Sequence, residues 1–228
     1  MVTPTNKSLI ERIVNVFETG SAEGRYDAIT IMNDGVNGSR QITYGRSQTT
    51  EQANLKELLA MYVEVNGVFS EAFSAYDDRV GIVSLADDNT FIDLLRRAAR
   101  EDPLMRQTQD EFFDKRYYQP AQKFFDSNRF ELPLSMLVIY DSFIHSGRIP
   151  DFLRRRFSES PPVRGGDEKT WTAAYVGVRE DWLANHTNQI LQKTIYRTRC
   201  FKEQIAADNW LLDKLPVMAN GVQVFPVV

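Results

Sequence analysis

Hydrophobic residues near the start of the chain recur with the period of an α-helix. Those that fall on one helical face are Leu9, Ile10, Ile13, Val14 and Phe17. Ser8 and Glu11 have the spacing of a capping box, and Gly20 is suited to a C-terminal cap. The pattern therefore predicts a first helix that begins near Ser8 and ends near Gly20.

The next stretch changes to the pattern of strands and tight turns. Two turn sequences, Asn33-Asp34-Gly35 and Asn37-Gly38, separate short runs that contain alternating apolar residues. Those apolar residues are Ile29, Ile31, Ile42 and Tyr44. We predict a small β-hairpin from about Ala28 to Arg46.

From Glu51 onward the helical period returns and dominates the rest of the chain. The most apolar segment runs from Leu132 to Ile144, and it is expected to form a central buried helix. A Pro- and Gly-rich stretch at residues 161–166 interrupts the pattern. Two further helices are predicted after it, from about Glu168 to Ala184 and from about Ile190 to Leu212.

Composition limits the class of protein. The 228 residues, 43% of them hydrophobic, suffice for one sizeable core and exclude a disulfide-stapled miniprotein or a disordered chain. A net charge of −4 argues against a nucleic-acid backbone as partner, because that affinity comes from clustered cations. A single cysteine, Cys200, and two histidines, His145 and His186, make no credible zinc site. We therefore expect no metal and no cofactor.

The chain shows no sign of membrane attachment. No apolar run reaches the length of a membrane span, and residues 1–7 lack the apolar stretch and cleavage site of a signal peptide. We expect the protein to be a monomer. We expect neither a membrane nor a nucleic acid as its partner. The route of export, if any, is left open.

Two carboxyl groups near the amino end are candidates for catalysis. Glu18 follows the last apolar residue of the first helix, where the helix dipole disfavours an anion and favours the protonated acid. Asp34 lies in a turn rich in Gly and Asn, whose backbone donors favour the carboxylate. Such an unequal pair suits glycoside hydrolysis, although a Glu near a helix end is usually solvated and an Asp before Gly usually forms a turn.

Three blocks of residues resemble the family 46 glycoside hydrolases, the chitosanases. The first comprises Phe17-Glu18-Thr19-Gly20, Tyr26, Asp34-Gly35 and Ile42-Thr43-Tyr44-Gly45, and the seven residues between Tyr26 and Asp34 are its most specific spacing. The others comprise Tyr118-Gln119-Pro120-Ala121, Tyr140-Asp141 and His145-Ser146-Gly147, then Gly165-Gly166-Asp167-Glu168, Tyr175 and Arg179. Three blocks in this order are far harder to obtain by chance than one.

The resemblance implies roles for the two carboxyl groups. Glu18 would be the general acid and Asp34 the general base of an inverting hydrolase, whose carboxyls are about 6.5–9.5 Å apart to leave room for a water. The family also places a hydroxyl soon after the base to orient this water. Counting forward from Asp34 gives Ser39, whereas counting back from Gly45 gives Thr43. We rank Thr43 slightly ahead because a regular strand fixes a hydroxyl better than a turn does.

The resemblance further implies a charged network behind the acid. Asp141 lies inside the apolar helix, where an unpaired charge is costly, so it needs a cationic partner. Arg179 and Arg199 are the partners that the resemblance offers, with Arg197 replacing Arg199 in a shifted alignment. A purely structural role for this network is about as well supported as a role in holding Glu18.

Three further residues are predicted to bind substrate. Tyr26 and Tyr44 could stack on sugar rings. Asn54 stands where a chitosanase would carry an acid to receive a glucosamine ammonium, and a neutral amide forms no ion pair. Glu51 and Glu57 are nearby acids that could compensate.

The helical pattern predicts a mainly α protein, and the resemblance implies a lysozyme-like α+β fold with a small β-hairpin beside an active-site cleft. We expect residues 1–228 to form one catalytic domain of two lobes. The expected activity is inverting endo-hydrolysis of β-1,4-linked glucosamine polymer, chitosan, outside the cell or at the cell wall. Two alternatives stay open: a hydrolase of peptidoglycan or partially acetylated chitin, and a non-catalytic polysaccharide-binding relative.

Overall fold

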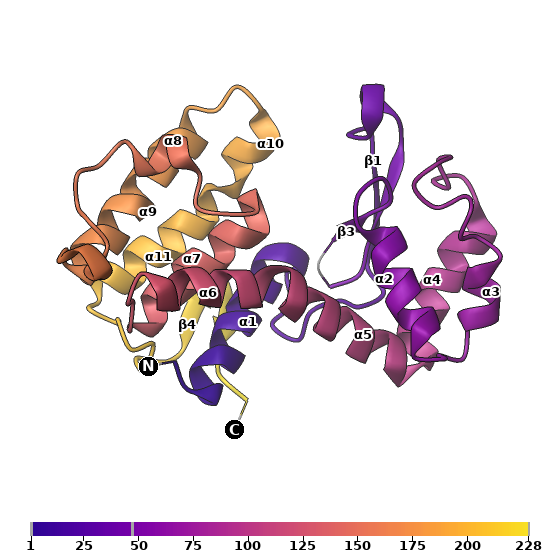
Figure 1. Cartoon of the computed structure of the whole chain (residues 1–228), viewed down its shortest axis with the longest axis horizontal. Coiled ribbons are helices and arrows are strands. Elements are labelled where there is room, and N and C mark those ends of the chain that lie inside the picture. Colours follow the sequence, from indigo (N-terminus) through magenta and orange to yellow (C-terminus); the bar gives the residue numbers. More distant parts are fainter. Residues whose placement is uncertain (1, 47, 228) are drawn as a thin grey trace. The chain divides into compact units, whose positions relative to one another are not determined.

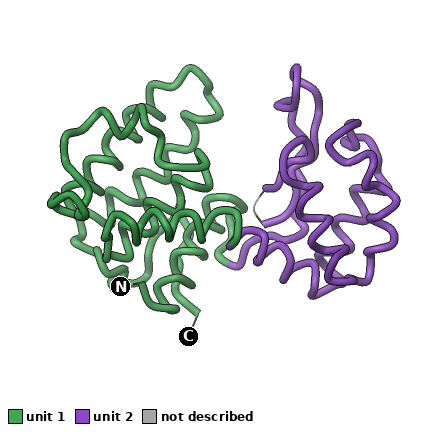
Figure 2. Tube along the Cα trace, viewed as in Figure 1, with its two compact units in different colours: residues 1–22, 115–228 green, residues 23–114 purple. Residues whose placement is uncertain are grey.

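The computed structural model describes residues 2–46 and 48–227 and divides into two compact units (Figure 2). Unit 1 combines residues 1–22 with residues 115–228, and unit 2 is the continuous stretch 23–114. Both units are mainly helical, and each contains a small antiparallel sheet (Figure 1). The prediction of one domain with two lobes stays a prediction.

The first helix, α1, spans Pro4–Thr19 in unit 1. Its start near Ser8 was predicted wrongly: the capping box is formed by Thr3 and Asn6, with a proline in the first turn. Its end was predicted correctly. Gly20 takes the left-handed conformation with φ 74°, and its N–H donates to Val16 O at 2.9 Å. Glu18 therefore lies in the last turn of α1.

The rest of unit 1 is a helical assembly with a short hairpin (Figure 1). Its helices are α6 (Gln119–Ser127), α7 (Pro133–Ser146), α8 (Asp151–Arg154), α9 (Glu168–Ala184), α10 (Gln189–Gln192) and α11 (Tyr196–Ala206). Its strands are β4 (Val217–Ala219) and β5 (Val222–Val224), which pair antiparallel. The predicted buried helix and the helix at 168–184 are confirmed as α7 and α9.

A single helix from Ile190 to Leu212 was predicted wrongly. The segment contains α10, a 3₁₀ turn at Lys193–Ile195 and then α11. The last helix stops at Ala206 because the chain beyond it has Asp208 at φ 50° and Leu212 at φ 53°, which an α-helix cannot contain.

The described residues of unit 2, 23–46 and 48–114, contain the predicted hairpin and four α-helices. Strands β1 (Ile29–Met32), β2 (Gln41–Tyr44) and β3 (Thr49–Thr50) form an antiparallel sheet in that order. Ile29 lies opposite Tyr44, and Met32 lies opposite Gln41, which confirms the hairpin. The helices are α2 (Leu55–Glu64), α3 (Ser70–Ser74), α4 (Asn89–Glu101) and α5 (Pro103–Phe113). A 3₁₀ turn at Val36–Gly38 follows Asp34 and Gly35.

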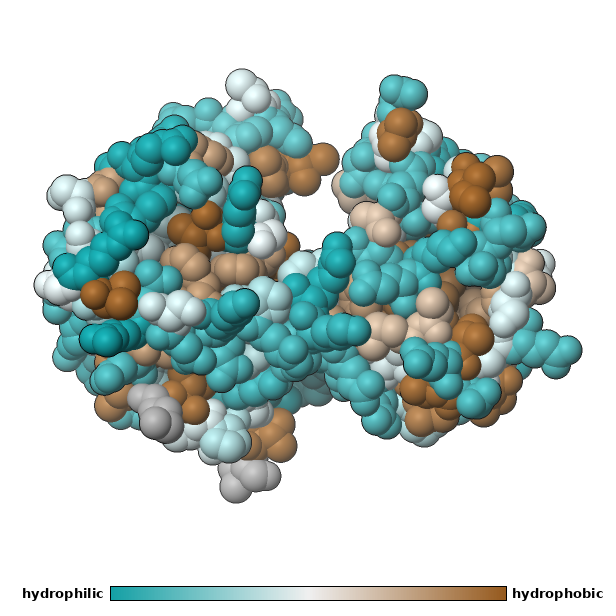
Figure 3. Space-filling model, in the orientation of Figure 1, coloured by the Kyte–Doolittle hydropathy of each residue, from teal (hydrophilic) through white to brown (hydrophobic). Residues whose placement is uncertain are grey.

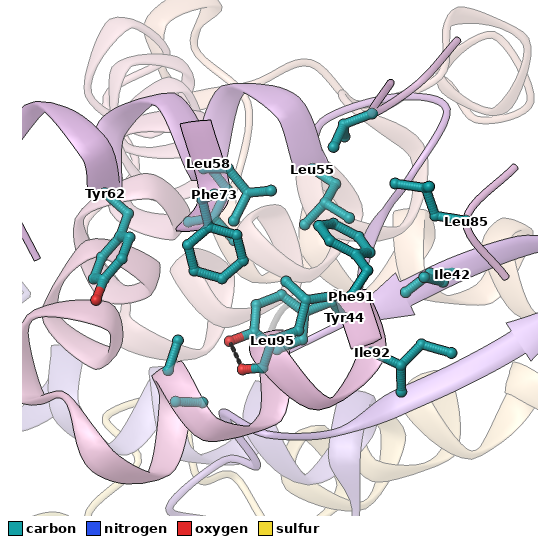
Figure 4. Close-up of a cluster of buried hydrophobic side chains, with 14 of the residues drawn as sticks. Ile42, Tyr44, Leu55, Leu58, Tyr62, Phe73, Leu85, Phe91, Ile92 and Leu95 are labelled. Carbon is teal, nitrogen blue, oxygen red and sulfur yellow. Dashed lines mark hydrogen bonds between the residues drawn. The ribbon is translucent and has the colours of Figure 1, made fainter. Parts of the chain in front are cut away.

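The core of unit 2 covers one face of strand β2. Ile42 and Tyr44 point toward side chains of α2 and α4, among them Leu55 and Leu95 (Figure 4). Because successive side chains of a strand point to opposite faces, Gln41 and Thr43 lie on the other face of β2. The packing of Ile42 and Tyr44 thus determines the direction of the Gln41 and Thr43 side chains, and Gln41 contacts Asp34.

The molecular surface is mostly hydrophilic on the face drawn in Figure 3, with hydrophobic residues as separate spots. Scattered apolar residues of this kind are normal on protein surfaces. Within residues 2–46 and 48–227, no helix is long and apolar enough to span a bilayer.

Candidate active site

Glu18 contacts a charged network inside unit 1. Arg197 Nη2 lies 2.5 Å from Glu18 Oε1, and Arg197 Nη1 lies 2.6 Å from Asp141 Oδ1. On the other side of Asp141, Arg179 Nη2 lies 2.7 Å from Oδ2. The Asp141 side chain is completely buried, so both guanidinium groups are anchored on a carboxylate that water does not reach.

The charges of this network stabilise one another. Burial by itself raises the pKa of Asp141, but the positive charges of Arg179 and Arg197 outweigh it, and the pKa is lowered. Burial likewise acts to lower the pKa of Arg197, but the carboxylates of Glu18 and Asp141 outweigh it and raise the pKa. Asp141 therefore stays ionised, and Arg197 keeps its charge beside Glu18.

His145 belongs to the same surroundings, one helical turn after Asp141 on α7. Burial, together with the positive charges of Arg179 and Arg197, lowers the pKa of His145 to about 3. The imidazole is therefore neutral at any pH at which the folded protein is expected to work. It adds no third positive charge to the network.

Arg199 was predicted wrongly as a member of this network. The structure places Arg197 there, and the Arg199 side chain is exposed. The reason is helix geometry: residues two apart on α11 are rotated by about 200°, so they face opposite sides. Sequence spacing alone does not tell which of the two arginines faces Asp141, because that depends on how α11 is rotated about its axis.

Tyr196 is a residue that the sequence analysis missed. Its hydroxyl donates to Phe17 O at 2.8 Å, and its ring lies 5.7 Å from the Phe17 ring. A second ring, that of Phe201, packs against Phe17 edge to face. Helix α11 thus fixes the last turn of α1, and with it the backbone that carries Glu18. No local pattern signals this contact, because the partners are 179 residues apart.

Asp34 lies in unit 2, near the start of the loop that follows β1. Its carboxylate is exposed, and Gln41 Nε2 donates to Oδ1 at 2.9 Å. Gln41 was not among the predicted site residues. It could have been found from the alternation along β2, which puts it on the face opposite to Ile42.

Ser39 lies close to Asp34 across a tight turn. The N–H of Gly35 donates to Ser39 O at 3.0 Å, and Ser39 Oγ accepts from Gln52 Nε2 at 2.9 Å. A Cβ atom at Gly35 would lie only 2.6 Å from Ser39 Oγ, so a side chain there would displace Ser39 or Gln52. Asp34 and Ser39 thus share the loop between β1 and β2, and Gln52 contacts this loop from the segment after β3.

Thr43 has different surroundings from Ser39. It lies in the middle of the sheet, paired with Thr30 on one side and Thr50 on the other. Its side chain is buried, and within the part of the chain that the structure describes its hydroxyl has no hydrogen-bond partner. Ser39, by contrast, is half-buried and already oriented by Gln52.

Tyr44 was predicted wrongly as a substrate-binding residue. It is completely buried in the core of unit 2, and its hydroxyl donates to Leu95 O at 2.8 Å (Figure 4). Its position on the core face of β2 excludes contact with a sugar.

Tyr26 and Asn54 stay candidates for substrate binding. Tyr26 is half-buried and donates to Asp110 Oδ1 at 2.9 Å. Asn54 is half-buried at the start of α2, and its side chain does not cap that helix. Of the two acids that could compensate for Asn54, Glu51 is buried and accepts from the N–H groups of Ile42 and Leu85. Its carboxylate is therefore occupied inside unit 2.

A metal centre has no support from the side chains. Among residues 2–46 and 48–227, no group of three or more His, Cys, Asp or Glu is placed to hold a metal ion.

Comparison with known proteins identifies the family. The model of glycosyl hydrolase family 46 matches residues 12–216. The chain is 27% identical over 196 residues to a chitosanase of Bacillus subtilis (strain 168), covering 80% of this chain and 69% of that protein.

Solved structures support the predicted fold class. The structure superimposes on a family 46 chitosanase of Gynuella sunshinyii in complex with chitotetraose with a TM-score of 0.84 at 21% identity, over the whole of both chains. The native chitosanase of Bacillus subtilis MY002 gives a TM-score of 0.80 at 22% identity, again over both whole chains. The predicted fold class is confirmed. Because the family match covers most of its length, the chain belongs to glycosyl hydrolase family 46 and is a glycoside hydrolase.

Proposed function

We propose that the protein is an endo-acting chitosan hydrolase that inverts the anomeric centre, with Glu18 as general acid and Asp34 as general base. The observation that carries this proposal is that Glu18 has a cation placed to stabilise the negative charge it acquires when it gives up a proton. Glu18 is held by a guanidinium anchored on a fully buried Asp141, whereas Asp34 is exposed and held by a neutral amide. Chitosan is the substrate named for the proteins to which the chain is similar.

In this mechanism Glu18 gives its proton to the oxygen of the leaving sugar. Negative charge develops on the Glu18 carboxyl during that transfer, and Arg197, 2.5 Å away, stabilises it. Because Arg197 is also bound to Asp141, it is in place before the reaction starts and costs no reorganisation. Asp34 meanwhile accepts a proton from the attacking water.

Ser39 is the hydroxyl that we infer to orient this water, in place of Thr43. Ser39 is half-buried, lies across the turn from Gly35, and is held by Gln52. Thr43 is buried within the sheet between two other strands. A hydroxyl must reach the water that the base activates, and Ser39 is the one that shares a loop with Asp34.

The substrate and the stereochemistry are tested together. The protein is incubated with chitosans of graded acetylation and with peptidoglycan, and the first products are followed by mass and by NMR. We expect products from the least acetylated chitosan, with the α-anomer appearing first from the β-linked polymer. Faster release from peptidoglycan or acetylated polymer would support the alternative substrate, and an initial β-anomer would rule out inversion.

The two carboxyls are tested by removing their charge with little change of shape. Glu18→Gln and Asp34→Asn should each lower kcat by about 10²–10⁴-fold, the usual contribution of a general acid or base. Glu11→Gln on the same helix and Asp93→Asn on α4 are matched controls and should leave kcat unchanged. Wild-type turnover by either Glu18→Gln or Asp34→Asn would contradict the assignment.

A further inference from the structure

Two glutamine side chains hold the loop that carries Asp34 and Ser39. Gln41 is the first residue of β2, and Gln52 follows the short strand β3. Gln41 Nε2 donates to Asp34 Oδ1 at 2.9 Å, and Gln52 Nε2 donates to Ser39 Oγ at 2.9 Å. The two glutamines are also joined to each other, because the N–H of Gln52 donates to Gln41 Oε1 at 3.2 Å.

The orientation of the Gln41 amide follows from its second partner. An amide can be turned over, so its oxygen and nitrogen are assigned from the hydrogen bonds around it. The backbone N–H of Gln52 can only donate, so it requires the oxygen of Gln41 on its side. The nitrogen must then face Asp34, whose carboxylate can only accept. The two contacts agree on a single orientation.

The same reasoning applies to Gln52. The backbone N–H of Val36 donates to Gln52 Oε1 at 2.6 Å, which turns the amide nitrogen toward Ser39. Ser39 Oγ therefore accepts this bond and keeps its own proton. That proton can be donated to another acceptor, such as a water.

The packing around these amides leaves little freedom. Gln41 is only 6% exposed although it is polar, and both ends of its amide are bonded, as a buried amide requires. At Gly35, an added Cβ atom would lie 2.7 Å from the amide of Gln52 and 2.6 Å from Ser39 Oγ. The loop thus closes tightly on Gln52.

We propose that Gln41 and Gln52 are positioning residues that aim the base and the water-orienting hydroxyl, a proposal that rests on the proposed roles of Asp34 and Ser39. Gln41 occupies one oxygen of Asp34 and leaves the other for the water. A neutral amide suits this task, because it orients the carboxylate without the full positive charge that would weaken it as a base. Gln52 donates to Ser39 Oγ, so the proton of Ser39 can be donated to another acceptor, such as a water.

The first experiment replaces Gln41 by Met, which has a similar length and no donor. We expect Gln41→Met to lower kcat on chitosan about 10- to 100-fold with KM within twofold, the loss that one hydrogen bond to a charged group implies. Gln107→Met, on an exposed position of α5 in the same unit, is the matched control and should leave both constants unchanged. If Gln41→Met does not fold, Gln41→Leu also removes the donor and should show the same loss of kcat.

The second experiment asks whether Gln52 acts through Ser39. Gln52→Glu keeps an acceptor for the N–H of Val36 but can no longer donate to Ser39. It should lower kcat severalfold in the parent and not lower it further in the Ser39→Ala background. A merely structural role would give the same fold-change in both backgrounds.

The two proposals fail in different ways. If Asp34→Asn turns over chitosan at the parent rate, both the role of Asp34 as base and the positioning role of Gln41 and Gln52 are overturned. If Asp34→Asn is inactive while Gln41→Met and Gln52→Glu keep the parent kcat, only the positioning role is overturned. A rise in KM with unchanged kcat would likewise overturn it and make the two glutamines ground-state binding residues.

Discussion

Single residues decide how charge is buried in this protein. Arg197 bridges Glu18 and the fully buried Asp141, whereas Arg199, two residues later on the same helix, is exposed. Removing one partner of a buried ion pair is expensive because the other charge stays behind without compensation. Removing an exposed arginine costs little. The two positions therefore form a natural comparison.

Arg197→Ala should lower the free energy of unfolding by about 3–5 kcal/mol, because it leaves Asp141 with one guanidinium instead of two. Arg199→Ala should change it by less than about 0.5 kcal/mol. Urea denaturation of both variants beside the parent measures the difference. Equal stabilities for the two variants would show that the buried network does not contribute as described.

The neutral His145 makes stability depend on pH. Its pKa in the folded protein is about 3, against an ordinary value of 6.5, so between these values the unfolded chain binds a proton that the folded protein does not. The neutral His145 therefore costs no stability above about pH 6.5, and the free energy of unfolding decreases as the pH falls from 6.5 toward 3. The lowered pKa of Asp141 acts in the same direction, but only below its ordinary 3.8.

A substitution that cannot titrate isolates this effect. Between pH 7 and pH 4 the Tm of His145→Gln should fall less than the Tm of the parent. The Tm of His186→Gln, the variant at the other histidine, should fall as much as that of the parent. Thermal unfolding followed by circular dichroism at several pH values measures the slopes. A parallel course for His145→Gln and the parent would contradict the low pKa of His145.

At the scale of elements, the ends of helices show what the chain encodes locally. Gly20 ends α1 in the left-handed conformation, at φ 74°, two residues after Glu18. Gly177 lies inside α9, where a helical backbone needs no glycine. An added Cβ atom would meet nothing within 4 Å at either position, so backbone conformation alone decides the effect.

The same substitution should therefore have opposite effects at the two glycines. Gly20→Ala should destabilise the protein by about 1–2 kcal/mol, the cost of a left-handed conformation for a residue with a Cβ atom. Gly177→Ala should stabilise it by about 0.5–1 kcal/mol. Chemical denaturation gives both values. Destabilisation by Gly177→Ala would indicate packing that the structure does not show.

On the scale of the whole molecule, the chain passes from unit 1 into unit 2 and back again. Residues 1–22 and 115–228 form one unit, and the continuous residues 23–114 form the other. Glu18 and Asp34 are only 16 positions apart in sequence yet belong to different units. The proposed reaction depends on both carboxyls, one as acid and one as base.

This dependence gives a kinetic prediction. If Glu18 and Asp34 serve one reaction, the double variant Glu18→Gln/Asp34→Asn should be only slightly slower than the slower single variant, because groups that act as a unit are strongly non-additive. Single-turnover rates on chitosan oligomers measure the three variants. If the fold-losses in rate of the two single variants multiply in the double variant, the two carboxyls contribute independently. That result would contradict their roles as the acid and base of one reaction.

Much of this protein could be inferred from the order of its residues. The hairpin, the buried helix α7, the helix α9 and the end of α1 follow from periodicity and turn chemistry, which act over a few neighbouring residues. The three blocks of motif residues pointed to the family because their identities, spacing and order can be read directly from the sequence.

Which side chains contact one another could be decided only from the tertiary structure. Arg197 rather than Arg199 reaches Asp141, Tyr44 faces the core rather than a sugar, and Gln41 faces Asp34. Each of these depends on how a helix or strand is rotated against elements far away in sequence. Rotation is set by burial of the whole apolar face, a long-range energy that no short window of sequence contains.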